Sequence, residues 1–390
     1  MTSIARARDA ADLLVLLPYQ LGYHPRRSVV LVLMDDRRIR MMQRLDIPPR
    51  RGDPEPITEQ ALAVVARQRP TSVLVAAFED EQGESRLLRR AVTKGLRRLG
   101  VPIHDHVVAC AGRYYEPWDR SAPAWGRPLP SAHEVPAVAE FVRLGIAPLA
   151  DRTALVDSLV PAVDGRAAGR VEAALDDVTT WEDAVGPGLR AQVWRDVLDP
   201  DPGATPVRDL PPRRLAVAIA SLLDVQWRDA LLGVLCPGAI PSISLLPVAF
   251  EDAQQALTAC VWTRADGEVQ PSREVRGSEG ADPTHDADVP DVPDSHEGVA
   301  RVQQRVADLI ACTPLEERPP VLTILGGLVW WTGDGTGATS CLEAALLIEP
   351  DYRLAMLMLQ LLRAGIRPEG WSMTSGGARA EPAAPDPLAG

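Results

Sequence analysis

Two pairs of carboxylates stand directly after apolar runs in the first third of the chain. Asp35 and Asp36 follow the run VLVLM, and Glu79 and Asp80 follow the run VLVAAF. In open α/β sheets, ligands bind outside the carboxyl ends of the strands. Together with Arg113, which follows a further apolar run, these carboxylates could hold Mg²⁺ and a phosphate group. The simpler alternative is that polar residues only mark where buried strands reach solvent.

Three histidines form a second set of residues with ligand chemistry. His104 and His106 alternate on one predicted strand, so their side chains share a face. His24 precedes another strand and could reach the same edge of the sheet, which would bring three imidazoles together. Apart from Asp46, no obvious fourth ligand accompanies them. The main interpretation is surface or capping histidines, and the sequence predicts no metal site.

A glycine-rich segment near the C-terminus, Gly333-Asp-Gly-Thr-Gly337, resembles a phosphate-binding loop in composition. However, no apolar strand precedes it and no Gly-Lys-Ser/Thr completes it. A turn between two helices explains the segment better. No Ser/His/Asp or Cys/His arrangement is recognisable, and Cys110 at the end of an apolar run is expected to be packed. The sequence therefore assigns no catalytic residue and no cofactor.

Charge and cysteine usage limit the classes of partner and compartment. The net charge is −12, from 41 basic and 53 acidic residues, and the first 150 residues carry a small basic excess while the remainder is acidic. Basic residues recur on one side of the predicted helix 84–99, but with this balance we expect a solvated helix face and no nucleic-acid partner. No run approaches the length of a membrane span. Five scattered cysteines without a CxxC pair indicate free thiols in the cytoplasm.

The hydrophobic pattern predicts the elements that must position these residues. A helix over 9–17 should end at Pro18 and reverse at Gly22, and the unbroken apolar run before Asp35 indicates a central strand covered on both sides. The predicted fold is a mixed, mainly parallel sheet with helices on both faces. Its further elements are a strand at 39–47 in a hairpin with 28–34, a helix capped by Thr58 and ending at 69, a strand at 71–78, a helix at 84–99 and a strand at 103–110.

The rest of the chain is expected to be helical. We predict an α/β sheet domain over 1–132, a helical middle region over 133–265, an acidic disordered linker over 266–298, a tetratricopeptide-like helical region over 299–371 and a disordered tail over 372–390. The last helices carry the spacing of one tetratricopeptide repeat, in which small residues let two helices approach closely. The residues at these spacings are Leu322, Leu325, Gly326, Gly333, Asp334, Ala338, Leu342, Ala345, Leu346 and Pro350, and the departures from the repeat are Leu322 in place of tryptophan and Val329 in place of tyrosine.

Several segments resemble an actinobacterial family, domain of unknown function 4192. The resemblance starts with the stretch PYQLGYHPRRSVVLVLM and continues through GIAPL from Gly145, WRDALL from Trp227 and WTGDG from Trp331. It covers roughly 9–371 and implies no activity. Family members often carry a cysteine cluster after the Gly-Arg-aromatic stretch. Here the loop after Tyr115, rich in proline and tryptophan, holds no cysteine, so no metal or redox role is expected of it.

From these observations we expect a cytoplasmic, non-catalytic binding or scaffold protein that contacts a protein partner through its helical C-terminal region. The alternative is an enzyme or sensor that acts on a phosphorylated or nucleotide-like small molecule at the carboxyl ends of the N-terminal strands. Stabilisation by nucleotides and divalent ions in a thermal-shift screen would separate the two.

Overall fold

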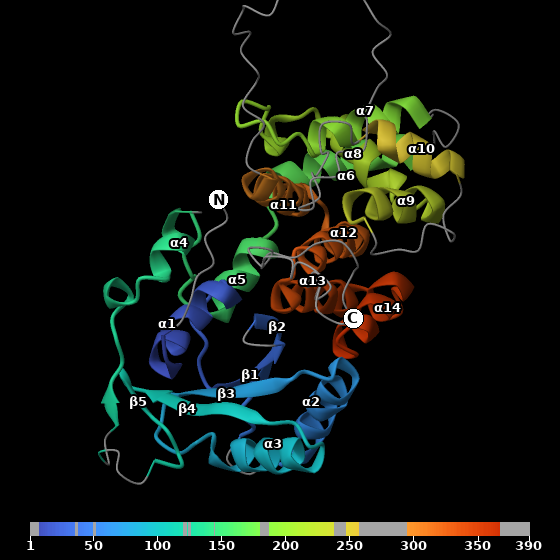
Figure 1. Cartoon of the computed structure of the whole chain (residues 1–390). Helices are drawn as coiled ribbons and strands as arrows, with labels where there is room; N and C mark the ends of the chain where they lie inside the picture. Colours follow the sequence, from blue (N-terminus) through green and yellow to red (C-terminus); the bar gives the residue numbers. More distant parts are fainter. Residues whose placement is uncertain are drawn as a thin grey trace, which may run out of the picture. The chain divides into compact units, whose positions relative to one another are not determined.

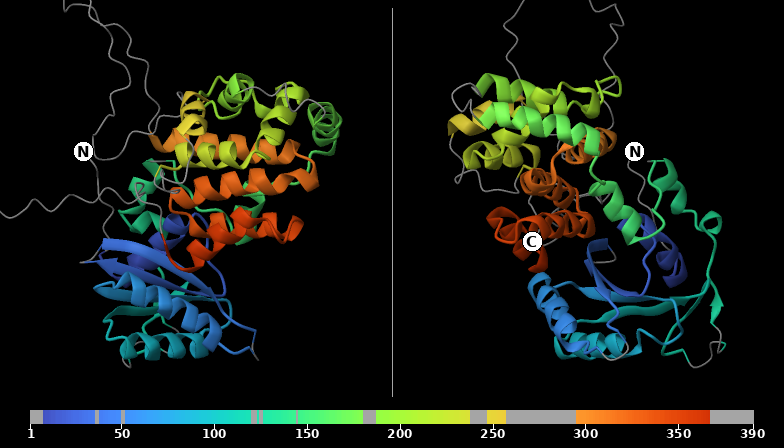
Figure 2. Two further views of the ribbon diagram at one scale, coloured as in Figure 1. Left: turned by 90° about the vertical axis from the view of Figure 1, so that its right-hand side faces the viewer. Right: turned by 180° about the vertical axis from the view of Figure 1, so that it is seen from behind.

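The computed structural model describes residues 8–35, 38–49, 52–119, 123, 126–143, 145–179, 187–237, 247–256 and 295–366. The chain forms two compact units, which meet in sequence at Arg152 and Thr153 (Figures 1 and 2). The first unit extends past the predicted boundary at residue 132, because α4 (Val138–Arg143) packs on α1 (Ala10–Leu21) in the same unit. The second unit is helical.

The sheet of the first unit has six strands in the order β2-β1-β3-β4-β5-β6. Of the pairs in this described sheet, β3 and β4 are parallel, and the other four pairs are antiparallel. A mixed sheet was expected, but the prediction that it is mainly parallel was wrong. The strands are β1 (Ser28–Asp35), β2 (Arg38–Asp46), β3 (Ser72–Glu79), β4 (Ile103–Cys110), β5 (Arg113–Tyr115) and β6 (Arg127–Pro128).

The direction of β3 explains the difference. β2 turns back on β1 as a hairpin, and α2 (Glu55–Gln68) then carries the chain to the far side of β1, where β3 pairs. β2 and β3 therefore both run against β1. The carboxyl end of β1 lies beside the amino end of β3, with Met34 opposite Ser72. This arrangement separates residues that follow β1 from residues that follow β3.

Helices cover both faces of the sheet, as predicted. Alternate β1 residues Val29, Leu31 and Leu33 pack with α2 and α3 (Arg86–Arg98), whereas Val30 and Val32 face α1 on the opposite side (Figure 1). All five side chains are fully buried. The unbroken apolar run thus reflects a central strand between two helical layers.

Two predicted helix boundaries were wrong for local reasons. α1 continues through Pro18 to Leu21 and ends at Gly22, whose φ of 78° is left-handed. Proline lacks only one amide donor, and the buried face of α1 holds the helix together on both sides of it. α2 begins at Glu55, before the expected cap Thr58, whose hydroxyl donates to the Pro54 carbonyl at 2.7 Å.

The second unit is built from ten helices in its described part, and a single apolar core joins them. This core takes residues from both sides of the predicted linker, so the helical middle and the C-terminal helices are not separate bodies. Ser295–Gly298, predicted as linker, belong to α11, while 266–294 and 372–390 lie outside the described residues. The helices are α5 (Arg152–Leu159), α6 (Gly165–Thr179), α7 (Pro187–Val197), α8 (Pro212–Ser221), α9 (Val225–Leu235), α10 (Pro247–Ala256), α11 (Ser295–Cys312), α12 (Arg318–Trp331), α13 (Gly335–Ile348) and α14 (Arg353–Arg363).

The last helices pack in sequence order, α11 on α12, α12 on α13 and α13 on α14 (Figure 2). A Cβ atom on Gly326 would lie 3.1 Å from Leu342 Cδ2, so glycine permits close approach of α12 and α13, as expected. The glycine-rich segment is the turn between these helices, and Asp334 Oδ1 accepts from the Gly337 amide at 2.8 Å. A helix start already capped by a carboxylate is a poor site for a phosphate. None of the described helices has the length and apolar character needed to cross a membrane.

Candidate functional site

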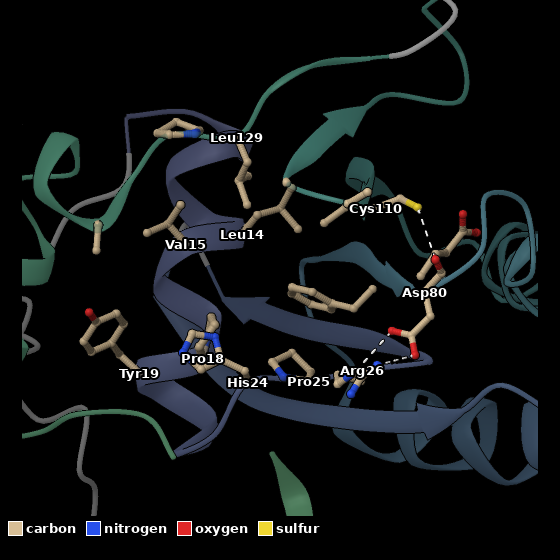
Figure 3. A pocket seen from close by; sticks show the side chains of 17 residues that line it. Leu14, Val15, Pro18, Tyr19, His24, Pro25, Arg26, Asp80, Cys110 and Leu129 are labelled. Atoms are coloured by element: carbon tan, nitrogen blue, oxygen red, sulfur yellow. Dashed lines mark hydrogen bonds and ion pairs between the residues drawn. The ribbon is translucent and has the colours of Figure 1, made fainter. Parts of the chain in front are cut away.

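A pocket of about 330 Å³ opens in the first unit where the carboxyl ends of β3 and β4 meet α1 (Figure 3). Its floor and walls are mainly apolar. Leu14 and Pro18 come from α1, Phe78 from β3, Ala109 from β4 and Leu129 from the segment after β6. The pocket therefore offers a compact, mainly apolar space of the size that small ligands occupy.

Polar groups line two sides of this pocket (Figure 3). Arg26 donates to Asp80 through two bonds, Nη2 to Oδ2 at 2.9 Å and Nε to Oδ1 at 3.3 Å. Cys110 Sγ lies 3.9 Å from the Asp80 carbonyl on the same side, whereas His24 and Tyr19 line the pocket on the α1 side (Figure 3). A fork of Arg26 and Asp80 beside an apolar space presents both a cation and an anion to an entering molecule.

Tight backbone turns shape the rim. Cys110 pairs with Arg113 across a two-residue hairpin whose central residues, Ala111 and Gly112, have φ of 49° and 71°. Two residues with positive φ make the turn that matches the twist of paired strands. The Gly112 carbonyl then accepts from the Leu129 amide at 2.9 Å, which fixes the outer wall.

Glu79 belongs to the pocket wall, but its carboxylate is bound to groups at the start of α3. The side chain has no exposed surface and accepts from the amides of Gly83 at 2.6 Å and Ser85 at 3.1 Å, and from the Ser85 hydroxyl. Arg89 lies 3.8 Å from the same carboxylate. Glu79 therefore joins the end of β3 to the start of α3, and does not face a ligand.

The network of Glu79 continues under α3. Arg89 Nε donates to the Ser85 hydroxyl at 2.6 Å, and its Nη1 lies 3.1 Å from His106 Nε2. Burial, and then the charges of Arg89 and Arg97, lower the pKa of His106 to about 3. His106 is thus a neutral imidazole that accepts from a cation, a role incompatible with proton transfer near neutral pH.

The other sequence candidates lie apart. Asp35, at the opposite end of the sheet from Asp80, pairs with Arg40 at 3.0 Å. Asp36 is outside the described residues. Arg113 donates to the Gly126 carbonyl at 2.9 Å and does not line the pocket. The described members of the predicted set do not come together: Asp35 lies apart from Glu79 and Asp80 because β1 and β3 are antiparallel.

The histidines are separated too. His24 lines the pocket on the α1 side, His106 is buried under α3, and His104 lies near the start of β4, 3.9 Å from Asp105. Among the residues that the structure describes, no group of three His, Cys, Asp or Glu side chains is placed to hold a metal ion.

Sequence reasoning found Asp80 but missed most of the pocket. The contributions of Tyr19 and Pro18 were hidden because α1 was predicted to end before them, and the loop beyond Tyr115 gave no apolar period to place Leu129. The position of the pocket, outside the carboxyl ends of β3 and β4, was the signal available in the sequence.

The chemistry available in the pocket favours binding over covalent catalysis. Burial, and then the nearby carboxylates of Glu79, Glu84 and Asp80, raise the pKa of the Cys110 thiol. A protonated thiol is a weak nucleophile. Asp80 is engaged by Arg26 in the structure.

Comparison with known proteins decides the family. The model of the family described as Domain of unknown function (DUF4192) matches residues 11–266 and 294–369. The chain belongs to this family. The DUF4192 match includes every residue that lines the pocket. No curated protein and no solved structure matches the chain.

Proposed function

We propose that the first unit binds a compact, largely apolar small molecule with one polar or zwitterionic head, in the pocket between α1 and the ends of β3 and β4. The observation that carries this proposal is an apolar space of about 330 Å³ with the Arg26–Asp80 fork on one side. An apolar body would displace water from Leu14 and Phe78. Its head would exchange hydrogen bonds with the fork and with His24.

A phosphorylated or nucleotide-like ligand has less support. Phosphate recognition needs an excess of positive donors. Arg26 is balanced by Asp80, and Arg113 is directed to Gly126. We therefore assign the pocket a binding or sensing role for apolar acids, amines or amino acids.

The proposal is tested by ligand-observed NMR on the full chain with a panel of such compounds, together with sugar phosphates and nucleotides. Ala132 lines the pocket at its half-buried rim, so Ala132→Phe should fill the space and abolish saturation transfer to the apolar compounds. Ala139→Phe is the matched control, because Ala139 is exposed on α4 and lies outside the pocket. Equal transfer in both variants, or transfer confined to the phosphorylated compounds, would refute the assignment.

The head group is tested separately with Arg26→Gln. This change should weaken carboxylate ligands about tenfold, the loss of one charge-assisted bond, and leave uncharged analogues unaffected. Equal loss for charged and uncharged compounds would mean that Arg26 only shapes the rim.

A second candidate function is a scaffold role of the helical C-terminal region, in which the tetratricopeptide-like pair α12 and α13 presents a surface to a protein partner. The supporting observation is the exposure of Leu347 on α13 and Leu357 on α14, at 86% and 47%. Free thiols at Cys110, Cys236, Cys312 and Cys341 support a reducing, cytoplasmic location. In pull-downs from the native host, Leu347→Glu should lose a partner that Leu223→Glu, a change at another exposed leucine, retains. A partner retained by both variants would argue against this surface.

A further inference from the structure

The outward face of α3 carries a continuous line of cations. Arg86, Arg90, Lys94, Arg97 and Arg98 are all exposed, and at about 100° per residue they fall within an arc of about 120°. We call these five residues the basic stripe. It extends over roughly 18 Å at ~1.5 Å per residue. The recurrence of basic residues on one side of this helix was visible in the sequence, where the small net charge of the first 150 residues led us to expect only a solvated face.

The cations of the stripe form no ion pairs within the described part of the chain. No described carboxylate forms an ion pair with any of the five, and α3 itself contains no acidic residue. The opposite side of α3 is buried through Leu88, Val92 and Leu96. The helix is therefore held in place by its apolar side and presents the stripe as a fixed surface.

An exposed aromatic ring borders the stripe. The guanidinium carbon of Arg97 lies 5.4 Å from the centre of the Trp118 ring, and the Trp118 and His106 rings pack in a T-shaped arrangement with centroids 4.8 Å apart. Trp118 remains 47% exposed. The contact with the buried His106 imidazole fixes the position of the Trp118 indole. A planar group of a ligand can therefore stack on an indole that is already oriented.

We propose that the basic stripe and Trp118 bind single-stranded nucleic acid, with the cations along the phosphates and a base stacked on the indole. Nonspecific single-strand sites combine a positive track with aromatic platforms. At ~3.4 Å per phosphate of a stacked strand, the stripe spans about five phosphates. A lipid surface is the competing partner, because Leu87 on α3 and Leu99 at its C-cap are exposed. It fits less well, since the apolar side of α3 is buried in the domain and cannot insert.

Fluorescence anisotropy of a labelled single-stranded oligonucleotide with the full chain tests this. Binding should weaken with salt with a log–log slope of about −3.5, the value for five phosphate contacts on a single strand. Arg90→Glu with Lys94→Glu should reduce affinity more than tenfold and lower the slope to about −2. The matched control is Arg166→Glu with Arg170→Glu, two exposed cations with the same spacing on α6, which should change affinity less than about twofold.

The aromatic contact has its own variants. Trp118→Leu should weaken binding about tenfold, and Trp118→Phe should restore most of it, because phenylalanine keeps a stacking face. Three results would overturn the proposal: absence of binding at low salt, equal losses in the α3 and α6 double variants, or stripe-dependent binding to anionic vesicles without binding to the oligonucleotide. Equal affinity for a duplex together with full affinity of Trp118→Leu would overturn the single-strand assignment.

Discussion

Replacing Glu79 by glutamine removes a charge from a carboxylate that has no exposed surface while keeping the shape of the side chain. A carboxylate accepts on both oxygens, from Gly83 on one and Ser85 on the other. A glutamine side chain accepts only on its one oxygen, so its NH₂ group must face the backbone N–H of Gly83 or Ser85. Arg89 is then left buried beside a neutral group.

The expected cost follows from these contacts. Removing one member of a buried ion pair costs about 3–5 kcal/mol, because the remaining charge loses its compensation. Arg89→Met should cost less, about 1–3 kcal/mol, since Glu79 keeps its bonds to Gly83 and Ser85. The double variant should lose less than the sum of the single losses, with a coupling of about 1–2 kcal/mol.

Hydrogen exchange read by mass spectrometry under increasing denaturant measures this locally, with peptides from β3 and β4 reporting on the first unit. A local readout is needed because a two-unit chain does not give one unfolding transition. Glu81→Gln, a change at an exposed neighbour, should shift the free energy by less than about 0.5 kcal/mol. A loss below about 1 kcal/mol for Glu79→Gln, or strict additivity with Arg89→Met, would refute the buried network.

Three further outcomes are expected. The lowered pKa of His106 means that the unfolded chain binds a proton more tightly than the folded chain. The free energy of unfolding of the first unit should therefore fall by about 2 kcal/mol between pH 7 and pH 5, and denaturant titrations of His106→Gln should show a smaller fall. Desolvation raises the pKa of Asp334 to about 6, so the second unit should instead gain up to about 3 kcal/mol from this group as pH falls from 7 towards 4. Asp334→Asn, which keeps an acceptor for the Gly337 amide, should remove this gain, and an Asn variant with the wild-type pH profile would count against the raised pKa. Gly326→Leu should overpack α12 against Leu342 and cost about 1–3 kcal/mol, measured by thermal and chemical unfolding; wild-type stability would contradict the close approach of the two helices.

Composition and periodicity predicted much of the first unit. The unbroken apolar run of β1 indicated a strand covered on both faces, and all of its inward residues are buried. The directions of the strands could not be predicted from the sequence. The pairing of β3 with β1 depends on the path of α2 across the sheet, which no local pattern encodes. Because β3 pairs antiparallel with β1, Asp35 lies at the opposite end of the sheet from Asp80.

The pocket shows the same limit. Asp80 follows an apolar run and could be predicted as a strand end, but its partner Arg26 precedes a different strand, and their bond depends on the three-dimensional path of both. Pro18 indicated a helix end, yet tertiary packing carries α1 past it and brings Tyr19 into the pocket wall. Local patterns define elements, whereas sites depend on contacts between them.

The most direct test of the proposed ligand site is a crystallographic screen in which crystals of the full chain are soaked with small apolar acids, amines and amino acids. We expect fragments to cluster between α1 and the carboxyl ends of β3 and β4, with apolar atoms against Leu14 and Phe78 and a polar atom within hydrogen-bonding distance of Arg26 or His24. Fragments that bind elsewhere on the first unit while this pocket stays empty would contradict the account.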